Sequence, residues 1–340
     1  MSLLEIEGLR VQFRTATGVS RAVDGLSLAV EAGQVLAIVG ESGCGKSVTA
    51  MSILGLLPEE ISRADGTIRF EGRDLLKLDE RAMQKIRGKA VSMVFQEPMT
   101  SLNPVLTVGR QIGETLRLHE GLGRRAVEAR ALEMLRLVGI PEPERRLKQY
   151  PHELSGGMRQ RVMIAMALAC NPRLLIADEP TTALDVTVQA QILDLMRDLI
   201  GRTGTGMVLI THDFGVVAEM AQRVVVMYAG RKVEEAPVRE LFAAPRHPYT
   251  RALLQSMPRL TEGAEAPEEL TEIPGAVPAL TEPVKACTFE PRCPRATEQC
   301  RTLYPSFVEC GDDHMVACWN PEPQSDEAVA EPRRQGEMKA

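Results

Sequence analysis

The strongest constraint on the fold is a glycine-rich stretch, residues 40–47, between an apolar segment and a helical segment. The stretch has the sequence Gly-Glu-Ser-Gly-Cys-Gly-Lys-Ser, which matches the pattern of a phosphate-binding loop. Residues 35–39 before it are apolar, as in a buried strand, and residues 47–57 after it predict a helix whose N-terminus would face the phosphates. A functionless glycine-rich turn is the alternative, but this order of strand, loop and helix favours a nucleotide site.

The loop pattern also predicts what each side chain does. Its glycines let the backbone turn so that successive N–H groups face phosphate oxygens. Lys46 would reach the β- and γ-phosphates, and the Ser47 hydroxyl would ligate a magnesium ion. The predicted nucleotide-binding residues of this segment are Gly40, Ser42, Gly43, Cys44, Gly45, Lys46, Ser47 and Val48.

A second segment supplies the carboxylates that such a site needs. Residues 174–179 read Leu-Leu-Ile-Ala-Asp-Glu, an apolar strand that ends in two acids. Asp178 would complete the magnesium shell. Glu179 is the candidate general base, because a carboxylate beside the metal ligand can orient water for attack on the γ-phosphate. A purely structural Glu179 is the alternative.

Composition limits the other classes of protein. The chain has 340 residues, 44% of them hydrophobic, which fits about two globular domains. Its formal net charge of −6 argues against nucleic acid as a partner. No apolar run reaches the roughly 18 residues of a membrane-spanning helix. The N-terminus lacks the features of a secretory signal, so we expect a cytosolic location.

Strand and helix signals alternate along most of the chain, which predicts an α/β fold around a mostly parallel sheet. Helical spacing is concentrated between residues 98 and 169, which predicts a helical subdomain there. The expected strands are residues 4–13, 27–30, 35–39, 174–177, 207–211 and 224–228. The expected helices after the first are residues 108–118, 125–138, 159–169 and 186–200.

Composition also suggests domain boundaries. Residues 1–260 would form the nucleotide-binding domain, and residues 261–320 would form a small cysteine-bearing module that begins with an extended connector rich in Pro, Glu and Thr. Residues 321–340 have no periodicity and predict a disordered tail.

A third motif indicates the family. Residues 154–158, Leu-Ser-Gly-Gly-Met, lie directly before a predicted helix, where the Ser hydroxyl and glycine amides suit a phosphate. With the phosphate loop before it, and Asp178 and His212 after it, the chain resembles the ATP-binding subunits of ABC transporters. The resemblance implies a P-loop ABC ATPase core with an N-terminal antiparallel β portion, a helical subdomain and a mostly parallel sheet.

The resemblance assigns further roles. His212 would contact the γ-phosphate, and Gln96 would touch the magnesium ion and the attacking water beside the membrane subunit. A local structural role is the alternative for each of them. Phe13 would stack on adenine or belong to the core. Four residues would act at the interface of a head-to-tail ATPase pair, each pair holding two ATP molecules: Ser155, Gly156, Gly157 and Asp185.

Three more segments narrow the family. Residues 150–153, 247–254 and 273–294 resemble the oligopeptide/dipeptide importer ATPases, a group that includes nickel and glutathione importers. Membership implies an ATP-hydrolysing subunit at the cytoplasmic face of the inner membrane, with a second nonidentical ATPase, two permeases and an extracytoplasmic substrate-binding protein. A soluble ABC ATPase and an iron–sulfur redox sensor are the competing classes.

Five of the seven cysteines crowd toward the end of the chain. In a reducing compartment such clustering favours metal or cluster ligation over disulfides. Four thiolates suit either tetrahedral zinc or a 4Fe–4S cluster, and Pro294 after the second cysteine is typical of ferredoxin motifs. Unligated thiols remain an alternative, and Cys310 and His314 are substitute ligands. The candidate ligands are Cys287, Cys293, Cys300 and Cys318.

Overall fold

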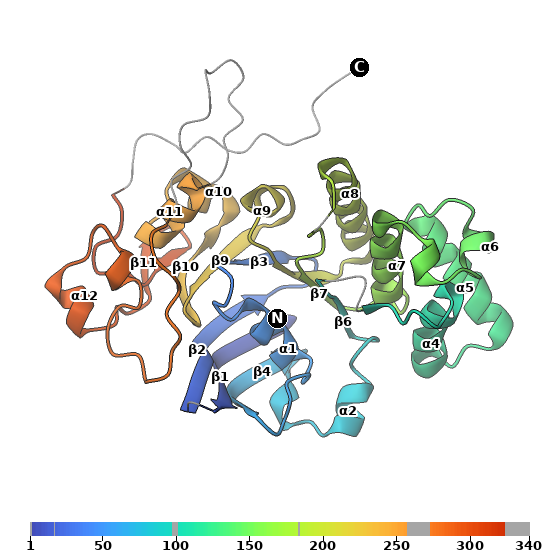
Figure 1. Cartoon of the computed structure of the whole chain (residues 1–340), viewed down its shortest axis with the longest axis horizontal. Helices are drawn as coiled ribbons and strands as arrows, with labels where there is room; N and C mark the ends of the chain where they lie inside the picture. The colour runs from blue at the N-terminus through green and yellow to red at the C-terminus, as the bar shows by residue number, and fades with distance from the viewer. Residues whose placement is uncertain (1, 17, 97–100, 183, 257–272, 324–340) are drawn as a thin grey trace, which may run out of the picture. The chain divides into compact units, whose positions relative to one another are not determined.

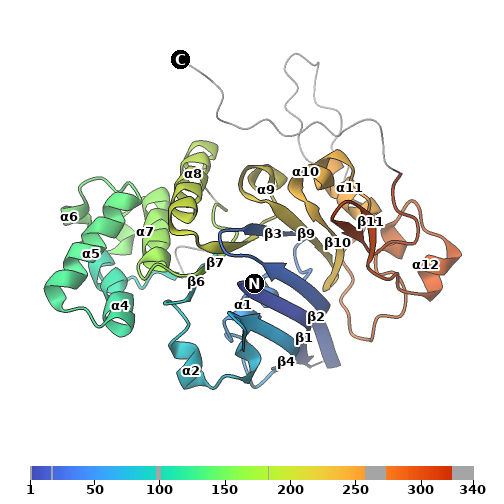
Figure 2. The same ribbon diagram turned by 180° about the vertical axis from the view of Figure 1, so that it is seen from behind.

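The computed structural model, shown in Figures 1 and 2, describes residues 2–16, 18–96, 101–182, 184–256 and 273–323. The chain divides into two compact units. Each unit is built from segments that are distant in sequence, because the chain passes between the units several times. Unit one comprises Met1–Glu5, Ala29–Val35 and Arg69–Ile210. Unit two comprises Ile6–Leu28, Leu36–Ile68 and Thr211–Ala340.

Three strands of unit one form a parallel sheet. β7 (Leu174–Asp178) pairs with β6 (Val91–Val94) on one side and with β8 (Gly206–Ile210) on the other. All residues of β7 and β8 are buried, as expected for parallel strands covered on both faces. The carboxyl end of β7 therefore delivers Asp178 to the edge of this sheet.

The helices of unit one form a cluster around α4 (Val108–Glu120), α5 (Arg124–Leu137) and α7 (Gly156–Leu168), shown in green in Figures 1 and 2. A methyl group on Gly113 would lie 2.6 Å from Val127 Cγ1, so this glycine lets α4 and α5 approach closely. The other helices given by the described residues of this unit are η1 (Leu75–Lys77), α2 (Glu80–Gln84), α6 (Pro143–Arg146), η2 (Pro151–Glu153) and α8 (Val186–Thr203). A short strand, β5 (Arg73–Asp74), precedes them.

Unit two has its own sheet segment. β3 (Val35–Val39) pairs in parallel with β9 (Arg223–Tyr228), which pairs antiparallel with β10 (Arg231–Pro237). Two strands from near the C-terminus, β12 (His314–Val316) and β11 (Val308–Gly311), extend this segment. Its helices are α1 (Lys46–Ile53), α9 (Phe214–Met220), α10 (Val238–Ala243), α11 (Pro248–Gln255), η3 (Glu290–Arg292) and α12 (Glu298–Thr302).

A separate sheet is formed by the N-terminal strands, most of whose residues belong to unit two. β1 (Leu4–Thr15) lies between β2 (Gly18–Val30) and β4 (Ser62–Phe70). Too few residues join β1 to β2 for a parallel crossover, so the two strands form an antiparallel hairpin. This is the antiparallel β portion that the family resemblance implied.

The structure confirms the α/β alternation and the parallel central strands, and it corrects several element boundaries. The strand expected at residues 27–30 begins at Gly18, and the helix expected at residues 47–57 ends at Ile53. β4 and β10 were not predicted, because charged residues interrupt their apolar pattern. The start of the predicted helical subdomain, residues 261–272 of the connector and most of the tail lie outside the described residues. None of the helices in the described part of the chain is long and apolar enough to cross a membrane.

Candidate nucleotide-binding site

The phosphate loop lies in unit two, between β3 and α1. Gly40 and Gly45 have positive φ angles of 149° and 104°. A Cβ atom on Gly40 would collide with the carbonyl oxygen of Met227, and one on Gly45 would collide with that of Ala22. Only glycine fits these two positions, so the loop follows the backbone of β9 and β2 closely.

Lys46 is held inside the loop. Its ammonium group donates hydrogen bonds to the carbonyl oxygens of Gly40 at 2.7 Å and Glu41 at 3.0 Å, and the residue is buried. Burial raises the pKa of the neighbouring Cys44 thiol, although the Lys46 charge opposes this effect, so Cys44 stays protonated at neutral pH. Ser47 and Val48 follow in the first turn of α1 and are half-buried, whereas Ser42 and Gly43 are exposed.

The predicted general base lies in unit one, where β7 ends. Asp178 is buried, and Glu179 after it has a positive φ of 45°, an unfavourable conformation for a residue with a side chain. The Glu179 N–H donates to the carbonyl of Ile210 at 2.8 Å, which holds this turn. The backbone thus turns sharply at the position where the carboxylate is needed.

The Glu179 carboxylate has two hydrogen-bond donors. Gln96 Nε2 donates to Glu179 Oε2 at 2.8 Å, and the Thr182 hydroxyl donates to the same oxygen at 2.9 Å. The structure therefore brings the predicted residues Gln96 and Glu179 into contact. Thr182 was not predicted, although its position three residues after Glu179 in a tight turn was a usable signal.

The segment after Glu179 is fixed by α7. Gln160 is almost completely buried, and its side-chain amide donates to the carbonyl oxygen of Pro180. Gln160 was not among the predicted site residues, because its partner is apparent only from the tertiary structure.

The Ser-Gly-Gly motif forms the N-terminus of α7. Ser155 caps the helix by accepting a hydrogen bond from the Met158 N–H at 3.3 Å, and Ser155 and Gly156 are exposed. A Cβ atom on Gly157 would lie 2.8 Å from Val188 Cγ1, so this glycine permits close packing of α7 on α8.

Three other predicted site residues, Asp185, His212 and Phe13, are exposed or half-buried. Asp185 is exposed and caps α8 by accepting from the Val188 N–H at 2.9 Å, which is a structural role within this chain. His212 is exposed and follows β8. Phe13 is half-buried near the end of β1. Ala183, two residues before Asp185, lies outside the described residues.

The four C-terminal cysteines lie near one another in unit two. Burial, with a smaller contribution from the charges of neighbouring thiols, raises the pKa of Cys287 to about 11 and that of Cys318 to about 12. Cys293 and Cys300 are among those neighbours for each of the two. Within the described residues, however, no three His, Cys, Asp or Glu side chains gather closely enough to hold a single metal ion.

Cys310 and His314, the predicted substitute ligands, are engaged elsewhere. The Cys310 thiol lies 3.4 Å from the His314 carbonyl oxygen, and His314 Nε2 lies 2.7 Å from a carboxylate oxygen of Glu234. These contacts join β10, β11 and β12 rather than complete a ligand set.

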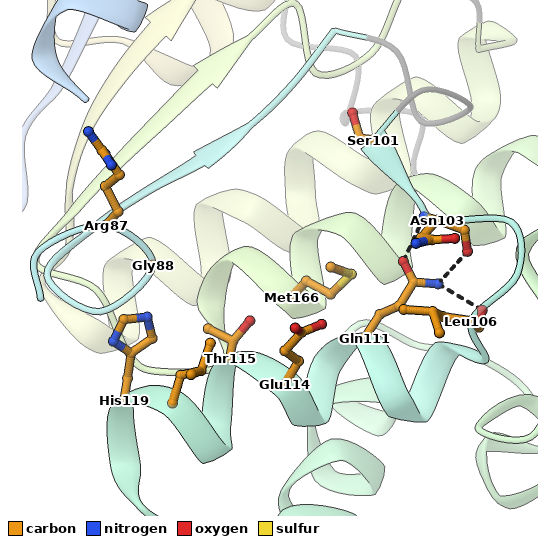
Figure 3. Close-up of a pocket in the computed structure, with 11 residues that line it drawn as sticks. Arg87, Gly88, Ser101, Asn103, Leu106, Gln111, Glu114, Thr115, His119 and Met166 are labelled. Carbon is orange, nitrogen blue, oxygen red and sulfur yellow. Dashed lines mark hydrogen bonds between the residues drawn. The ribbon is translucent and has the colours of Figure 1, made fainter. Parts of the chain in front are cut away.

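A pocket of about 460 Å³ lies in unit one beside α4 (Figure 3). The side chain of Gln111 lines the pocket and donates to the carbonyls of Asn103 at 3.1 Å and Leu106 at 2.9 Å. Two large apolar side chains nearby in sequence are mostly exposed, Val105 at 75% and Leu118 at 74%, and Leu118 lines the pocket. The other lining residues are Arg87, Gly88, Ser101, Glu114, Thr115, His119 and Met166.

Two family models match the chain: ABC transporter over residues 23–182, and oligopeptide/dipeptide transporter, C-terminal region, over residues 233–300. A probable peptide ABC transporter ATP-binding protein, y4tR of Sinorhizobium fredii, is 57% identical over 318 residues, which cover 93% of this chain and 94% of the relative. The dipeptide transport ATP-binding protein DppD of Bacillus subtilis is 50% identical over 329 residues, covering 96% of this chain and 97% of DppD.

Solved structures agree with these relatives. A dimeric ATP-binding cassette in a post-hydrolysis state, bound to ADP and Pi, matches with a TM-score of 0.63 and 29% identity, covering 69% of this chain and 99% of that chain. The fold and the phosphate loop therefore define an ATP-binding cassette, an ABC-type ATPase. The chain belongs to the family of ATP-binding proteins of oligopeptide/dipeptide ABC transporters.

Proposed function

We propose that this ATPase drives an importer of dipeptides or oligopeptides; the names of two relatives, a peptide ABC transporter ATP-binding protein and a dipeptide transport ATP-binding protein, support the substrate class. The observation that carries the catalytic part is the Glu179 carboxylate, which is held by Gln96 and Thr182 directly after the strand-ending Asp178. This arrangement supports Glu179 as the base that orients water. The attacking oxygen bonds to the γ-phosphorus while the bond to the β–γ bridging oxygen breaks, and ADP leaves.

The phosphate loop and the candidate metal ligands would supply the other nucleotide contacts. In the proposal, Lys46 exchanges its carbonyl partners for phosphate oxygens, and the loop amides bind the same phosphates. Ser47, Gln96 and Asp178 would hold Mg²⁺, and these hard oxygen donors fit that ion. When bound, Mg²⁺ neutralises charge on the β- and γ-phosphates.

Glu179→Gln tests this assignment. The amide keeps the shape of the side chain but cannot act as a base, so we expect Mg·ATP binding to persist and turnover to fall by about a hundredfold or more. Glu133→Gln is the control, because Glu133 is an exposed carboxylate of α5 paired with Arg130. Turnover of Glu179→Gln within a few fold of the unchanged protein would remove Glu179 from the mechanism.

We propose that the working unit is a head-to-tail pair with a second, nonidentical ATPase. Exposure of Ser155 and Gly156 at the N-terminus of α7 supports contact with nucleotide bound by a partner. His212 and Phe13 would serve the nucleotide of their own loop, and Asp185 and Gly157 would lie near the interface. Mg·ATP should make the Glu179→Gln protein associate with its partner ATPase, whereas ADP should not, as measured by light scattering.

The pocket beside α4 is the proposed docking site for a cytosolic segment of the permeases, which would keep the ATPase at the cytoplasmic face of the membrane. Exposed Leu118 and Val105 support an apolar partner helix there. Leu118→Glu should abolish co-purification with the permeases and leave Mg·ATP affinity unchanged. Val186→Glu, at an exposed valine of α8, is the control. Normal co-purification of Leu118→Glu would exclude this surface. The substrate-binding protein would contact the permeases rather than this chain.

We also propose that residues 261–320 form a module whose four thiols hold a 4Fe–4S cluster. The proximity of Cys287, Cys293, Cys300 and Cys318, and Pro294 directly after Cys293, support this cluster over zinc. When bound, the cluster would either cross-link the four cysteines and stabilise the module or serve as a redox centre. Anaerobic purification should give iron and acid-labile sulfide. Zinc, or no metal at all, would contradict the proposal.

A further inference from the structure

An arginine of the cysteine-bearing segment, residues 287–318, contacts the phosphate loop from outside. Arg292 donates two hydrogen bonds to the carboxylate of Glu41, the second residue of the loop, at 2.8 and 2.9 Å. The Arg292 side chain is only 5% exposed, and that of Glu41 is 28% exposed. A bidentate, charge-assisted pair of this kind is among the stronger polar contacts in proteins.

Arg292 has a fixed position of its own. Its Nε donates to the carbonyl of Pro274 at 2.8 Å, and its Nη2 donates to the carbonyl of Ile273 at 3.1 Å. A third contact joins its Nη1 to the Tyr228 hydroxyl at 3.3 Å. The residue ends η3, one position before Cys293, so the fold of the cysteine-bearing segment determines where this guanidinium lies.

The same segment also supports the loop through an aromatic cluster. The N–H of Glu41 donates to the hydroxyl of Tyr249 at 2.8 Å. The ring of Tyr249 packs against Tyr228 and Phe289, with centroids 4.7 and 5.3 Å away. All three rings are buried, and Phe289 belongs to the cysteine-bearing segment. Glu41 is therefore fixed at its backbone and at its carboxylate by residues that lie outside the loop.

We propose that Arg292 is a positioning residue for ATP binding, which acts by neutralising Glu41. The loop must receive a polyanion, and an unpaired carboxylate within it would repel the phosphates. Arg292 cancels that charge without contacting nucleotide itself. This proposal rests on the proposed nucleotide site, and it gives the C-terminal segment an effect on nucleotide affinity.

The electrostatic role makes a graded prediction. In Arg292→Gln the Glu41 charge is released, so affinity should fall more for a triphosphate than for a diphosphate and should not change for adenosine. We expect Mg·ATP to bind about tenfold more weakly, or about 1.4 kcal/mol. The loss for Mg·ADP should be about threefold.

The double variant Glu41→Gln/Arg292→Gln separates this role from a merely structural one. With both charges removed, the repulsion is absent, and Mg·ATP affinity should return to within about twofold of the unchanged protein. A purely structural arginine would not be rescued in this way. Arg295→Gln, at a more exposed arginine of the same segment that pairs with Glu322, is the matched control.

The experiment is calorimetric titration of the full-length chain with Mg·ATP, Mg·ADP and adenosine. If Arg292→Gln fails to fold, Arg292→Lys replaces it: the lysine keeps a positive charge beside Glu41, so Mg·ATP affinity should stay within about twofold of the unchanged protein. Equal Mg·ATP affinity of Arg292→Gln and the unchanged protein, or failure of Glu41→Gln to restore affinity, would overturn the proposal. Failure of the unchanged protein to bind Mg·ATP would instead refute the proposed function.

Discussion

Replacing Glu234 with glutamine should weaken the C-terminal part of unit two. Glu234 lies on β10 and is completely buried. One carboxylate oxygen accepts from the Arg246 N–H at 2.6 Å and faces His314 Nε2 at 2.7 Å. The other accepts from the His247 N–H at 3.0 Å. A single carboxylate thus ties β10 to β12 and to the start of α11.

The magnitude follows from counting donors. In Glu234→Gln one oxygen becomes an NH₂ group, which must face the N–H of either Arg246 or His247. One buried backbone N–H then loses its acceptor, at a cost of about 1–3 kcal/mol. Loss of the negative charge also weakens the remaining contact, so we expect a total of about 2–4 kcal/mol in the free energy of unfolding.

Urea denaturation followed by circular dichroism measures this change. Glu235→Gln is the matched control, because the neighbouring Glu235 is more exposed and pairs with Lys232 and Arg223. The free energy of unfolding of Glu235→Gln should fall by no more than about 1 kcal/mol. Equal destabilisation by the two variants, or no change for Glu234→Gln, would refute the view that the buried acceptor holds these elements together.

Two further predictions concern the loop and α11. Gly40→Ala should abolish measurable nucleotide binding, because its methyl group would collide with the backbone. The control is Gly72→Ala, where φ is 78° and the space is open, and it should leave nucleotide affinity unchanged. Equal nucleotide affinities of the two variants would contradict this prediction. Burial lowers the pKa of His247 from 6.5 to about 4, so the unfolded chain takes up a proton at a higher pH than the folded chain does. The free energy of unfolding should therefore fall by about 3 kcal/mol as the pH drops from 6.5 to 4. His247→Asn keeps an acceptor for the Tyr249 N–H but should lose this component of the pH dependence in unfolding measurements, and an unchanged pH profile would contradict it.

The sequence predicted best those elements whose signal is local. The apolar runs before Gly40 and Glu179 are strands whose ends lie within one residue of the prediction. β10 was missed because four of its seven residues are charged, and Glu234 is accommodated only by partners far along the chain. Local pattern cannot reveal a buried carboxylate that is satisfied by tertiary contacts.

The same limit applies to the site. The phosphate loop and the paired acids are contiguous motifs, so they could be predicted from the sequence alone. The Arg292 to Glu41 ion pair spans 251 residues, and nothing in either segment alone indicates the other. Asp185 shows the reverse case, since a residue assigned by resemblance to an interface also caps its own helix.

The most direct test is ATP-driven uptake of labelled dipeptides and oligopeptides into vesicles that contain the permeases, both ATPases and the binding protein. We expect uptake that requires Mg·ATP and falls at least tenfold when this chain carries Glu179→Gln. Uptake at the original rate with Glu179→Gln would contradict the account, as would transport of nickel or glutathione in place of peptides.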